Sequence, residues 1–416
     1  MRTLLLLLLL LAAGPARADT VAVFSPTGPD AAAYGAAEGY PVHAIGPQRL
    51  QRYLVGAFSH AEQLLPHRTI PAAPSAAPFA RAPAEIALSY PYRGAAHTLA
   101  DYLERHPVTG LLIVRDRTIM FEHYQYARTD RDHFLSQSMA KTVNAKLVGI
   151  AIAEGSIRSV DDPAATYVPG LAGSQLGATP IRALLHMASG IAFTEVYDGQ
   201  DDSAKLGRLL WQKGGAGPVA AVRQFDTRTA PPDTAFHYAG LNSEVLGLVL
   251  SAATRMHPSD YLGSRIWQRI GTESEATWQV DAAGQEATMC CISAVLRDWA
   301  RFGVLLANDG AWDGRQVIPR QWLLDAPTAA PGSPFAPGVA TRFYGYGYQT
   351  WLFPPFPGLG ERRQFALLGV HGQAVFVDPP SKLVLVHTAV RPKASNDPMG
   401  PELNALWAAL VRQFGR

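Results

Sequence analysis

The sequence predicts an α+β protein, in which an antiparallel sheet is flanked by helices and carries an inserted all-helical domain. Strand-like runs occur near residue 110 and again at residues 343–390, whereas helical patterns alternate with loops between them. Runs of strands separated by runs of helices are typical of this fold class. The 416 residues are 48% hydrophobic and 17% charged, which suffices for a large buried core.

The chain divides into three parts by composition and pattern. Residues 19–96 form an N-terminal extension whose arm, "IPAAPSAAPFARAPA" (70–84), is too rich in proline for a helix interior or a central strand. Residues 97–157 and 285–416 are predicted to form the sheet domain, and residues 158–284 the helical domain. We expect the active site at the interface between these two domains.

The first elements of the sheet domain follow from hydrophobic spacing. "TLADYLERH" (98–106) predicts a helix, and "TGLLIVRDRTIMFEHYQYA" (109–127) predicts two strands around a turn at residues 115–117. "MAKTVNAKLVGIAIAEG" (139–155) has helical spacing and a glycine at its end, where helices often stop.

The last part of the chain predicts the rest of the sheet and a closing helix. Three strand-like runs follow one another, and a Pro-Pro turn joins the second to the third. They are "RFYGYGYQTWLF" (342–353), "QFALLGVHGQAVFVD" (364–378) and "KLVLVHTAV" (382–390), and the amphipathic helix is "ELNALWAALVRQF" (402–414).

Residues 1–18 have the pattern of a secretory signal peptide. Arg2 precedes an apolar core at residues 4–13, and a small-x-small sequence at residues 16–18 predicts cleavage before Asp19. A membrane anchor is the alternative, but the apolar stretch is too short to span a bilayer. We therefore expect a periplasmic or secreted protein without stable membrane insertion after cleavage.

Composition excludes several classes of protein. The net charge is +2 and no run of Lys or Arg occurs, so we expect no nucleic-acid partner. The 12 histidines show no metal-binding spacing, and no glycine-rich nucleotide motif is present, so we expect no metal and no cofactor. The adjacent pair Cys290 and Cys291 would form only a strained bridge, and we interpret both as small buried apolar residues. The oligomeric state is not predicted.

"FLSQSMAKTV" (134–143) is the first candidate for chemistry. Ser138 and Lys141 share one face at the start of a predicted helix. Partial burial there disfavours the charged form of a lysine, and a neutral amine could take the serine proton. The same two residues could instead be a helix cap and a snorkelling side chain, so more distant residues must decide between these interpretations.

Two further stretches offer what a serine–lysine mechanism lacks. Tyr238 lies directly before the predicted helix in "TAFHYAGLNSEVLGLVL" and could carry a proton to the leaving group. His371, Gly372 and Gln373 lie in a predicted strand that could align a substrate and donate a backbone N–H. Either a tyrosine or a histidine alone would more often be a structural residue.

These three motifs, in this order, resemble the serine β-lactamase and penicillin-binding superfamily. Within it, "SQSMAKT", "LLHMASGI" and "RDWARFGVLLANDG" are most similar to class C β-lactamase-like hydrolases of the 6-aminohexanoate-dimer hydrolase group. The resemblance covers roughly residues 97–412 and implies a β-lactamase-like fold.

The resemblance also implies roles for individual residues. Ser138 would be the acylated nucleophile, Lys141 its general base, and Tyr238 the proton carrier. His371 would stand where the family has the lysine of its Lys-Thr-Gly strand motif. The oxyanion hole would consist of the Ser138 N–H and one N–H from Gln373 or Ala374.

The chain departs from the family pattern at two places. The family's Tyr-x-Asn is Tyr238-Ala239-Gly240 here, and its Lys-Thr-Gly is His371-Gly372-Gln373. Both losses point away from efficient β-lactam hydrolysis.

A further resemblance concerns "FTEVYDGQDD" (193–202), where Tyr197 would match a tyrosine that closes over the substrate in the nylon-oligomer group. The aspartates of this loop either attract a substrate amine or are simply solvated.

The sequence thus predicts an exported serine hydrolase that acts on an ester or a small linear amide. Two alternatives stay open. One is a β-lactamase or D-alanyl-D-alanine carboxypeptidase, and the other is a non-catalytic penicillin-binding-like sensor or binder of peptidoglycan fragments.

Overall fold

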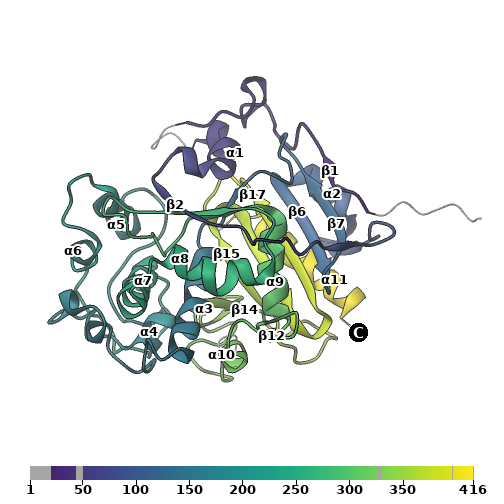
Figure 1. The fold of residues 1–416 in the computed structure, drawn as a ribbon. Coiled ribbons are helices and arrows are strands. Elements are labelled where there is room, and N and C mark those ends of the chain that lie inside the picture. Colours follow the sequence, from purple (N-terminus) through teal and green to yellow (C-terminus); the bar gives the residue numbers. More distant parts are fainter. Residues whose placement is uncertain (1–19, 44–49, 326–328, 396, 416) are drawn as a thin grey trace, which may run out of the picture.

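The computed structural model describes residues 20–43, 50–325, 329–395 and 397–415; the predicted signal peptide lies outside them. A nine-stranded sheet forms the centre (Figure 1). Its strands are antiparallel except for two short ones from the N-terminal extension, which pair in parallel with β7. The order is β1 (Val23–Phe24), β7 (Thr118–Tyr124), β6 (Val108–Arg115), β17 (Leu383–Ala389), β16 (Gln373–Asp378), β15 (Phe365–Gly369), β14 (Thr350–Leu352) and β13 (Gly345–Gly347), with β3 (Ala80–Arg81) also on β7. The predicted α+β sheet is confirmed.

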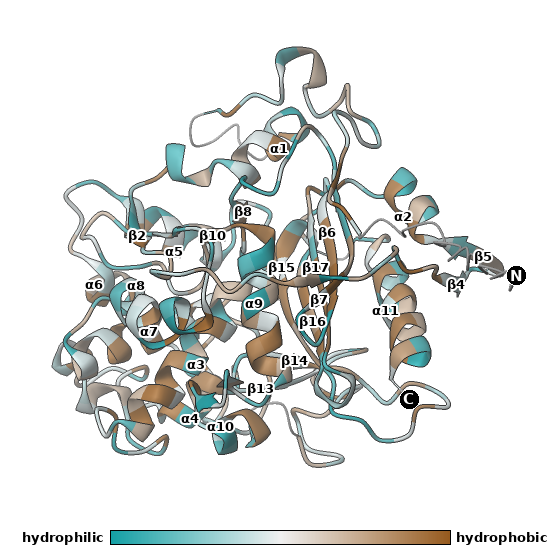
Figure 2. Ribbon diagram, turned by 45° about the vertical axis from the view of Figure 1, so that its right-hand side comes forward, coloured by the Kyte–Doolittle hydropathy of each residue, from teal (hydrophilic) through white to brown (hydrophobic). Residues whose placement is uncertain are grey.

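Helices cover both faces of this sheet (Figure 2). Helices α3 (Met139–Ala153) and α9 (Leu296–Ala307) pack on one face, and α11 (Gly400–Phe414) packs on the other. Alternation along β6 explains this arrangement, because successive side chains of a strand point to opposite faces. Leu112 and Val114 belong to the core on the α3 side, whereas Leu111 and Ile113 belong to the core on the α11 side.

The helical part of the chain contains a strand that the sequence did not predict. Five α-helices lie between residues 158 and 284, but β9 (Ala276–Gln279) pairs there with β2 (His67–Ile70) and with β10 (Ile292–Ala294), which also pairs with β8 (Phe134–Leu135). The prediction of an all-helical insertion is therefore wrong at this strand. The helices are α4 (Ile181–Leu185), α5 (Asp202–Trp211), α6 (Pro218–Val222), α7 (Gly240–Thr254) and α8 (Pro258–Leu262).

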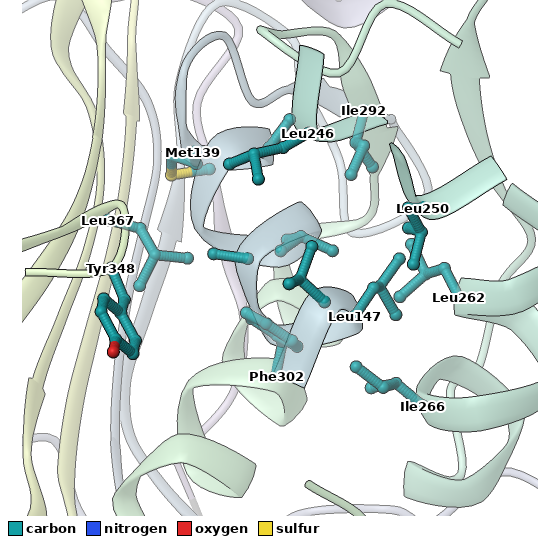
Figure 3. Close-up of a cluster of buried hydrophobic side chains, with 14 of the residues drawn as sticks. Met139, Leu147, Leu246, Leu250, Leu262, Ile266, Ile292, Phe302, Tyr348 and Leu367 are labelled. Carbon is teal, nitrogen blue, oxygen red and sulfur yellow. The ribbon is translucent and has the colours of Figure 1, made fainter. Parts of the chain in front are cut away.

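One hydrophobic cluster joins the sheet to the helices. Figure 3 shows Met139 and Leu147 of α3 among side chains such as Leu246 of α7, Phe302 of α9 and Leu367 of β15. Because α3 is buried on nearly every side, it serves as the central element against which both parts of the molecule pack. The residues at the N-terminus of α3 are therefore held in a fixed position.

The N-terminal extension is built into both sheets. Strands β1 and β3 line the outer edge of β7, and β2 lines the outer edge of β9. Helix α1 (Gln51–Ser59) belongs to a third hydrophobic cluster that also includes Leu135 and Cys291. The Tyr34 hydroxyl donates a hydrogen bond to the Val390 carbonyl, 2.7 Å away. The extension is thus an integral part of the fold.

The remaining elements are short. They are α2 (Leu99–Arg105), which begins with a capping box between Thr98 and Asp101, α10 (Arg320–Asp325), and the hairpins β4–β5 (Ser89–Tyr92 and Ala95–Thr98) and β11–β12 (Ala311–Trp312 and Arg315–Gln316). Among the described residues, no helix is both long and apolar enough to cross a bilayer.

A buried lysine in α3 leads to a prediction about stability. Lys146 is 1% exposed, its Nζ donates to Thr350 Oγ1 at 2.9 Å, and no carboxylate of the described chain forms an ion pair with it. Burial lowers the pKa of Lys146 to about 7. Between that value and pH 10.5 the unfolded chain binds the additional proton, so the energetic cost of Lys146 is largest below pH 7 and disappears as the pH rises towards 10.5.

We therefore expect Lys146→Met to raise the free energy of unfolding at pH 7 by up to about 4 kcal/mol. Urea denaturation of both proteins at pH 6, 7 and 9 measures the effect. The difference in free energy of unfolding between the two proteins should become smaller at pH 9. A difference that does not depend on pH would contradict the lowered pKa of Lys146.

Candidate active site

Ser138 stands at the N-terminus of α3, directly after a constrained turn. Gln137 has a left-handed backbone with a φ of 48°, a conformation that residues other than glycine rarely adopt without supporting contacts. The support comes from Ser136, whose N–H donates to the Ile292 carbonyl at 2.7 Å and whose Oγ accepts the Ile292 N–H at 3.0 Å. Ser136 is thus a structural residue, and Ser138 remains partly exposed to solvent.

Lys141 contacts Ser138 directly. Its Nζ lies 2.9 Å from Ser138 Oγ and donates at 2.5 Å to the Met289 carbonyl. Lys141 is 3% exposed, so its amine is shielded from water while it faces the hydroxyl. The distance permits proton transfer from Ser138 Oγ to a neutral Lys141 amine.

A buried carboxyl group that the sequence did not single out lies behind this pair. Glu244 of α7 is 2% exposed, and its Oε1 accepts the Met289 N–H at 2.9 Å. Burial raises the pKa of Glu244 to about 7, against the opposing effects of the Met289 N–H and the charge of Lys141. The backbone of Met289 therefore links the two side chains, because its N–H donates to Glu244 and its carbonyl accepts from Lys141. The only sequence signal was an acidic residue within the apolar stretch of a predicted helix.

Tyr238 completes a group of three. Its ring centroid lies 5.2 Å from Lys141 Nζ, and the ring stacks on Trp351 of β14 with centroids 5.4 Å apart. Burial raises the pKa of Tyr238 above its ordinary value, while interactions with Lys141 and Ser138 oppose that rise. The structure thus brings the predicted residues Ser138, Lys141 and Tyr238 together, with a neutral phenol beside the nucleophile and the base.

His371 and Gly372 lie in a turn between β15 and β16, not inside one strand as the sequence suggested. His371 has a φ of 63°, its N–H donates to the Ala394 carbonyl at 3.0 Å, and its Nδ1 contacts the Arg391 carbonyl at 2.6 Å. The ring also meets Phe58 of α1 edge-on, with centroids 5.2 Å apart. Apolar residues alternate with other residues on both sides of this turn, so the sequence pattern resembled one continuous strand.

This hairpin reaches the nucleophile through Gly369. A Cβ at Gly369 would fall 2.4 Å from the Ser136 carbonyl oxygen, so only glycine permits the approach. The Ser138 N–H has no acceptor within the described part of the chain and is available to an oxyanion, whereas the His371 N–H is already used. Gln373 turns its side chain to the Ala389 carbonyl at 2.6 Å, so any role for Gln373 or Ala374 would lie in their backbone N–H groups.

Tyr197 reaches the site together with Glu195, which sequence reasoning missed. The Tyr197 hydroxyl donates to Glu195 Oε1 at 2.8 Å. Burial, followed by the charge of Glu195, raises the pKa of Tyr197 well above its usual value. The nearby aspartates bind their own loop instead: Asp201 accepts the N–H groups of Val196 and Tyr197. Glu195 is the carboxylate of this loop whose charge acts on Tyr238, where it helps to raise the pKa.

Glu195 also accounts for the missing asparagine at position 240. The Gly240 N–H donates to Glu195 Oε2 at 2.5 Å. A Cβ at Gly240 would lie 3.2 Å from that same oxygen and 3.3 Å from Met289 Cβ. The carboxylate of Glu195 thus fills the space into which a side chain at position 240 would extend.

The two cysteines differ from their predicted state. Cys290 and Cys291 form a disulfide between adjacent residues, so their interpretation as free apolar side chains is wrong, although Cys291 is buried as expected. Cys291 has a left-handed backbone with a φ of 84°. The pair directly follows Met289, and it therefore belongs to the segment that presents the Met289 carbonyl to Lys141.

Known proteins share both the sequence pattern and the fold. The model of the Beta-lactamase family matches residues 95–406, about three quarters of the chain. The 6-aminohexanoate-dimer hydrolase of Paenarthrobacter ureafaciens is 27% identical over 365 residues, which cover 83% of this chain and 89% of that protein.

Solved structures agree in fold. "Putative 6-aminohexanoate-dimer hydrolase from Bacillus anthracis" has a TM-score of 0.77 at 22% identity, covering 89% of this chain and 97% of that one. EstCE1, a hydrolase with promiscuous acyltransferase activity, has a TM-score of 0.60 at 13% identity, covering 73% and 94%. With the Ser138–Lys141 pair at the start of a buried helix beside a mostly antiparallel sheet, this chain belongs to the Beta-lactamase family.

Proposed function

We propose that this protein is an exported serine hydrolase that cleaves an ester or a small linear amide through an acyl-enzyme. The observation that carries the proposal is the contact between Lys141 Nζ and Ser138 Oγ at 2.9 Å, with Tyr238 beside both. Export rests on the signal-peptide pattern of residues 1–18.

Acylation follows from this geometry. The Lys141 amine takes the proton of Ser138, and Oγ attacks the substrate carbonyl carbon. The oxygen that becomes negative accepts the free N–H of Ser138 and one N–H from Gln373 or Ala374. Collapse of this intermediate breaks the bond to the leaving group, which receives a proton through Tyr238.

Deacylation uses the same groups in the reverse order. Water passes one proton through Tyr238 to the Lys141 amine as it attacks the acyl carbon, and Ser138 Oγ leaves as it takes that proton back from Lys141. The acid product departs as a carboxylate.

The groups around Tyr238 support an uncharged or amine-bearing substrate. Aromatic rings of Tyr238, Trp351 and Tyr346 lie against one another, and Glu195 adds a negative charge. A carboxylate near Tyr238 would be repelled by Glu195, and this chain has no lysine at position 371 to attract one. The name of the relative from Paenarthrobacter ureafaciens supports a linear amide as one candidate.

A substrate panel tests the proposal. The mature protein and Ser138→Ala are each offered a short-chain nitrophenyl ester, a linear aminohexanoate dimer and a chromogenic cephalosporin. We expect turnover of the ester or the dimer by the wild type only, with a transient acyl adduct on the peptide that contains Ser138, detected by mass spectrometry.

The other outcomes separate the alternatives. Turnover of the cephalosporin without ester or dimer hydrolysis would show a β-lactamase and overturn the proposal. A stable adduct on Ser138 without turnover would show a sensor. Activity that survives in Ser138→Ala would exclude Ser138 as the nucleophile.

A further inference from the structure

A cavity of about 430 Å³ lies on the α11 face of the sheet, next to the hairpin that carries His371. Gly369, Gly372 and Gln373 form one of its walls, and the first turn of α11 forms another. None of Ser138, Lys141 and Tyr238 lines it. The cavity is therefore a second site, separated from the nucleophile by the hairpin.

Arg391 supplies the buried charge of this cavity. It is 6% exposed, yet no carboxylate of the described chain forms an ion pair with it. Its Nε is buried without a hydrogen-bond partner, and its Nη2 reaches only the Tyr102 hydroxyl, at 3.5 Å. A buried guanidinium normally has a carboxylate or phosphate partner, because desolvating the charge alone is costly.

The described residues around Arg391 leave room for an anion beside its guanidinium. A Cβ at Gly372 would lie 2.9 Å from Arg391 Nε, so the guanidinium passes directly beneath the hairpin. Among the described residues, a Cβ at Gly400 would meet only Arg391 Nη1, at 3.7 Å. Gly400 is the first residue of α11, a helix of 15 residues. Its N–H already donates to the Asp397 carbonyl at 3.1 Å and Pro401 has no N–H, so the helix start offers an anion only the positive end of its dipole. The unpaired guanidinium of Arg391 is therefore the feature that favours an anion, and the helix dipole acts in the same direction.

The other charged groups do not replace that anion. Glu402 of α11 already binds Arg105, His106 and Tyr90. Asp397 lines the cavity, but its Oδ1 accepts the Met399 N–H at 2.8 Å. Lys393 is exposed at the rim and adds a second positive charge.

The rest of the lining is mostly apolar, including Tyr344, Leu368, Phe376 and Leu403. We propose that this cavity binds the carboxylate of a small apolar acid, with Arg391 on the anion and the apolar wall around the carbon chain. The site goes beyond the proposed hydrolysis, because it holds its ligand on the far side of the hairpin from Ser138.

Thermal unfolding with three matched six-carbon probes tests the ligand class. We expect hexanoate to raise the melting temperature saturably, whereas hexanamide and hexylamine should not. Arg391→Met should weaken the hexanoate effect at least about tenfold, since a charge-assisted hydrogen bond is lost. Arg342→Met, which removes an exposed arginine nearby, should leave the stabilisation by hexanoate unchanged. The proposal would be overturned if hexanamide raised the melting temperature as much as hexanoate, or if hexanoate stabilised the Arg391→Met variant as much as the wild type.

A crystal soak locates the ligand without any variant. In wild-type crystals with 6-bromohexanoate, we expect the anomalous bromine signal in the cavity and the carboxylate on Arg391. A signal only beside Ser138, or no signal together with no thermal shift, would overturn the proposal. Neither measurement needs turnover, so an inactive protein would leave this result intact and would count only against the hydrolase.

Discussion

Replacing Lys141 by methionine is expected to lower kcat/KM for a short-chain nitrophenyl ester by about 10⁵-fold, as much as Ser138→Ala does. Residues that act as one unit in a nucleophilic step show this behaviour, because losing either leaves the other without a role. Lys141 Nζ lies 2.9 Å from Ser138 Oγ, and Lys141 is 3% exposed, so bulk water is kept from acting as a substitute base. Steady-state kinetics on the three proteins measure the loss.

The double variant makes this prediction stricter. If Ser138 and Lys141 form one unit, Ser138→Ala combined with Lys141→Met should be no slower than either single variant. Lys146→Met is a matched control, because it makes the same change in the same helix away from Ser138. It should retain ester turnover. Multiplicative losses in the double variant would show instead that Ser138 and Lys141 contribute independently and do not form one unit.

Tyr238→Phe is expected to slow hydrolysis of a linear amide by about 10²- to 10⁴-fold, the usual range for removal of a general acid or base. The effect on a nitrophenyl ester should be clearly smaller, because nitrophenolate leaves without a proton whereas an amine does not. Phenylalanine keeps the stacking on Trp351 and the edge contact with Tyr346. The comparison therefore isolates the hydroxyl, and kcat/KM for the two substrates is the measurement.

Tyr261→Phe serves as the control for loss of a buried hydroxyl. Tyr261 donates to Glu154 at 2.8 Å, at the opposite end of α3 from Ser138, and removal of its hydroxyl should change neither substrate's kinetics. Equal losses on amide and ester in Tyr238→Phe would contradict a leaving-group role. Unchanged rates on both substrates would remove Tyr238 from the mechanism.

Local spacing accounts for what the sequence could predict. Ser138 and Lys141 are three residues apart on a helix, so their contact follows from helix geometry once the helix is recognised. The β6–β7 hairpin and the closing helix α11 likewise follow from period and turn residues within one stretch. Placing Tyr238 beside this pair needed the family pattern, because nothing in its own stretch points to Ser138.

Contacts between distant segments account for the rest. Glu195 meets the Gly240 N–H only because the 193–202 loop folds over the start of α7, and Glu244 meets Met289 across 45 residues. Strand β9 exists because β2 and β10 pair with it from both sides. The bond between Cys290 and Cys291 depends on a backbone conformation at Cys291 that sequence patterns do not reveal.

The way the N-terminal extension is woven into the molecule has a practical consequence for choosing a recombinant fragment. The family match begins at residue 95, which invites a shorter expression product that starts there. Such a product would lack β1, β2 and β3 and would present the bare edges of β7 and β9 to other chains. Unpaired strand edges recruit further strands and promote aggregation. The boundary of a well-behaved fragment is therefore dictated by hydrogen bonding at the sheet edges, far upstream of the point where sequence similarity to the family starts.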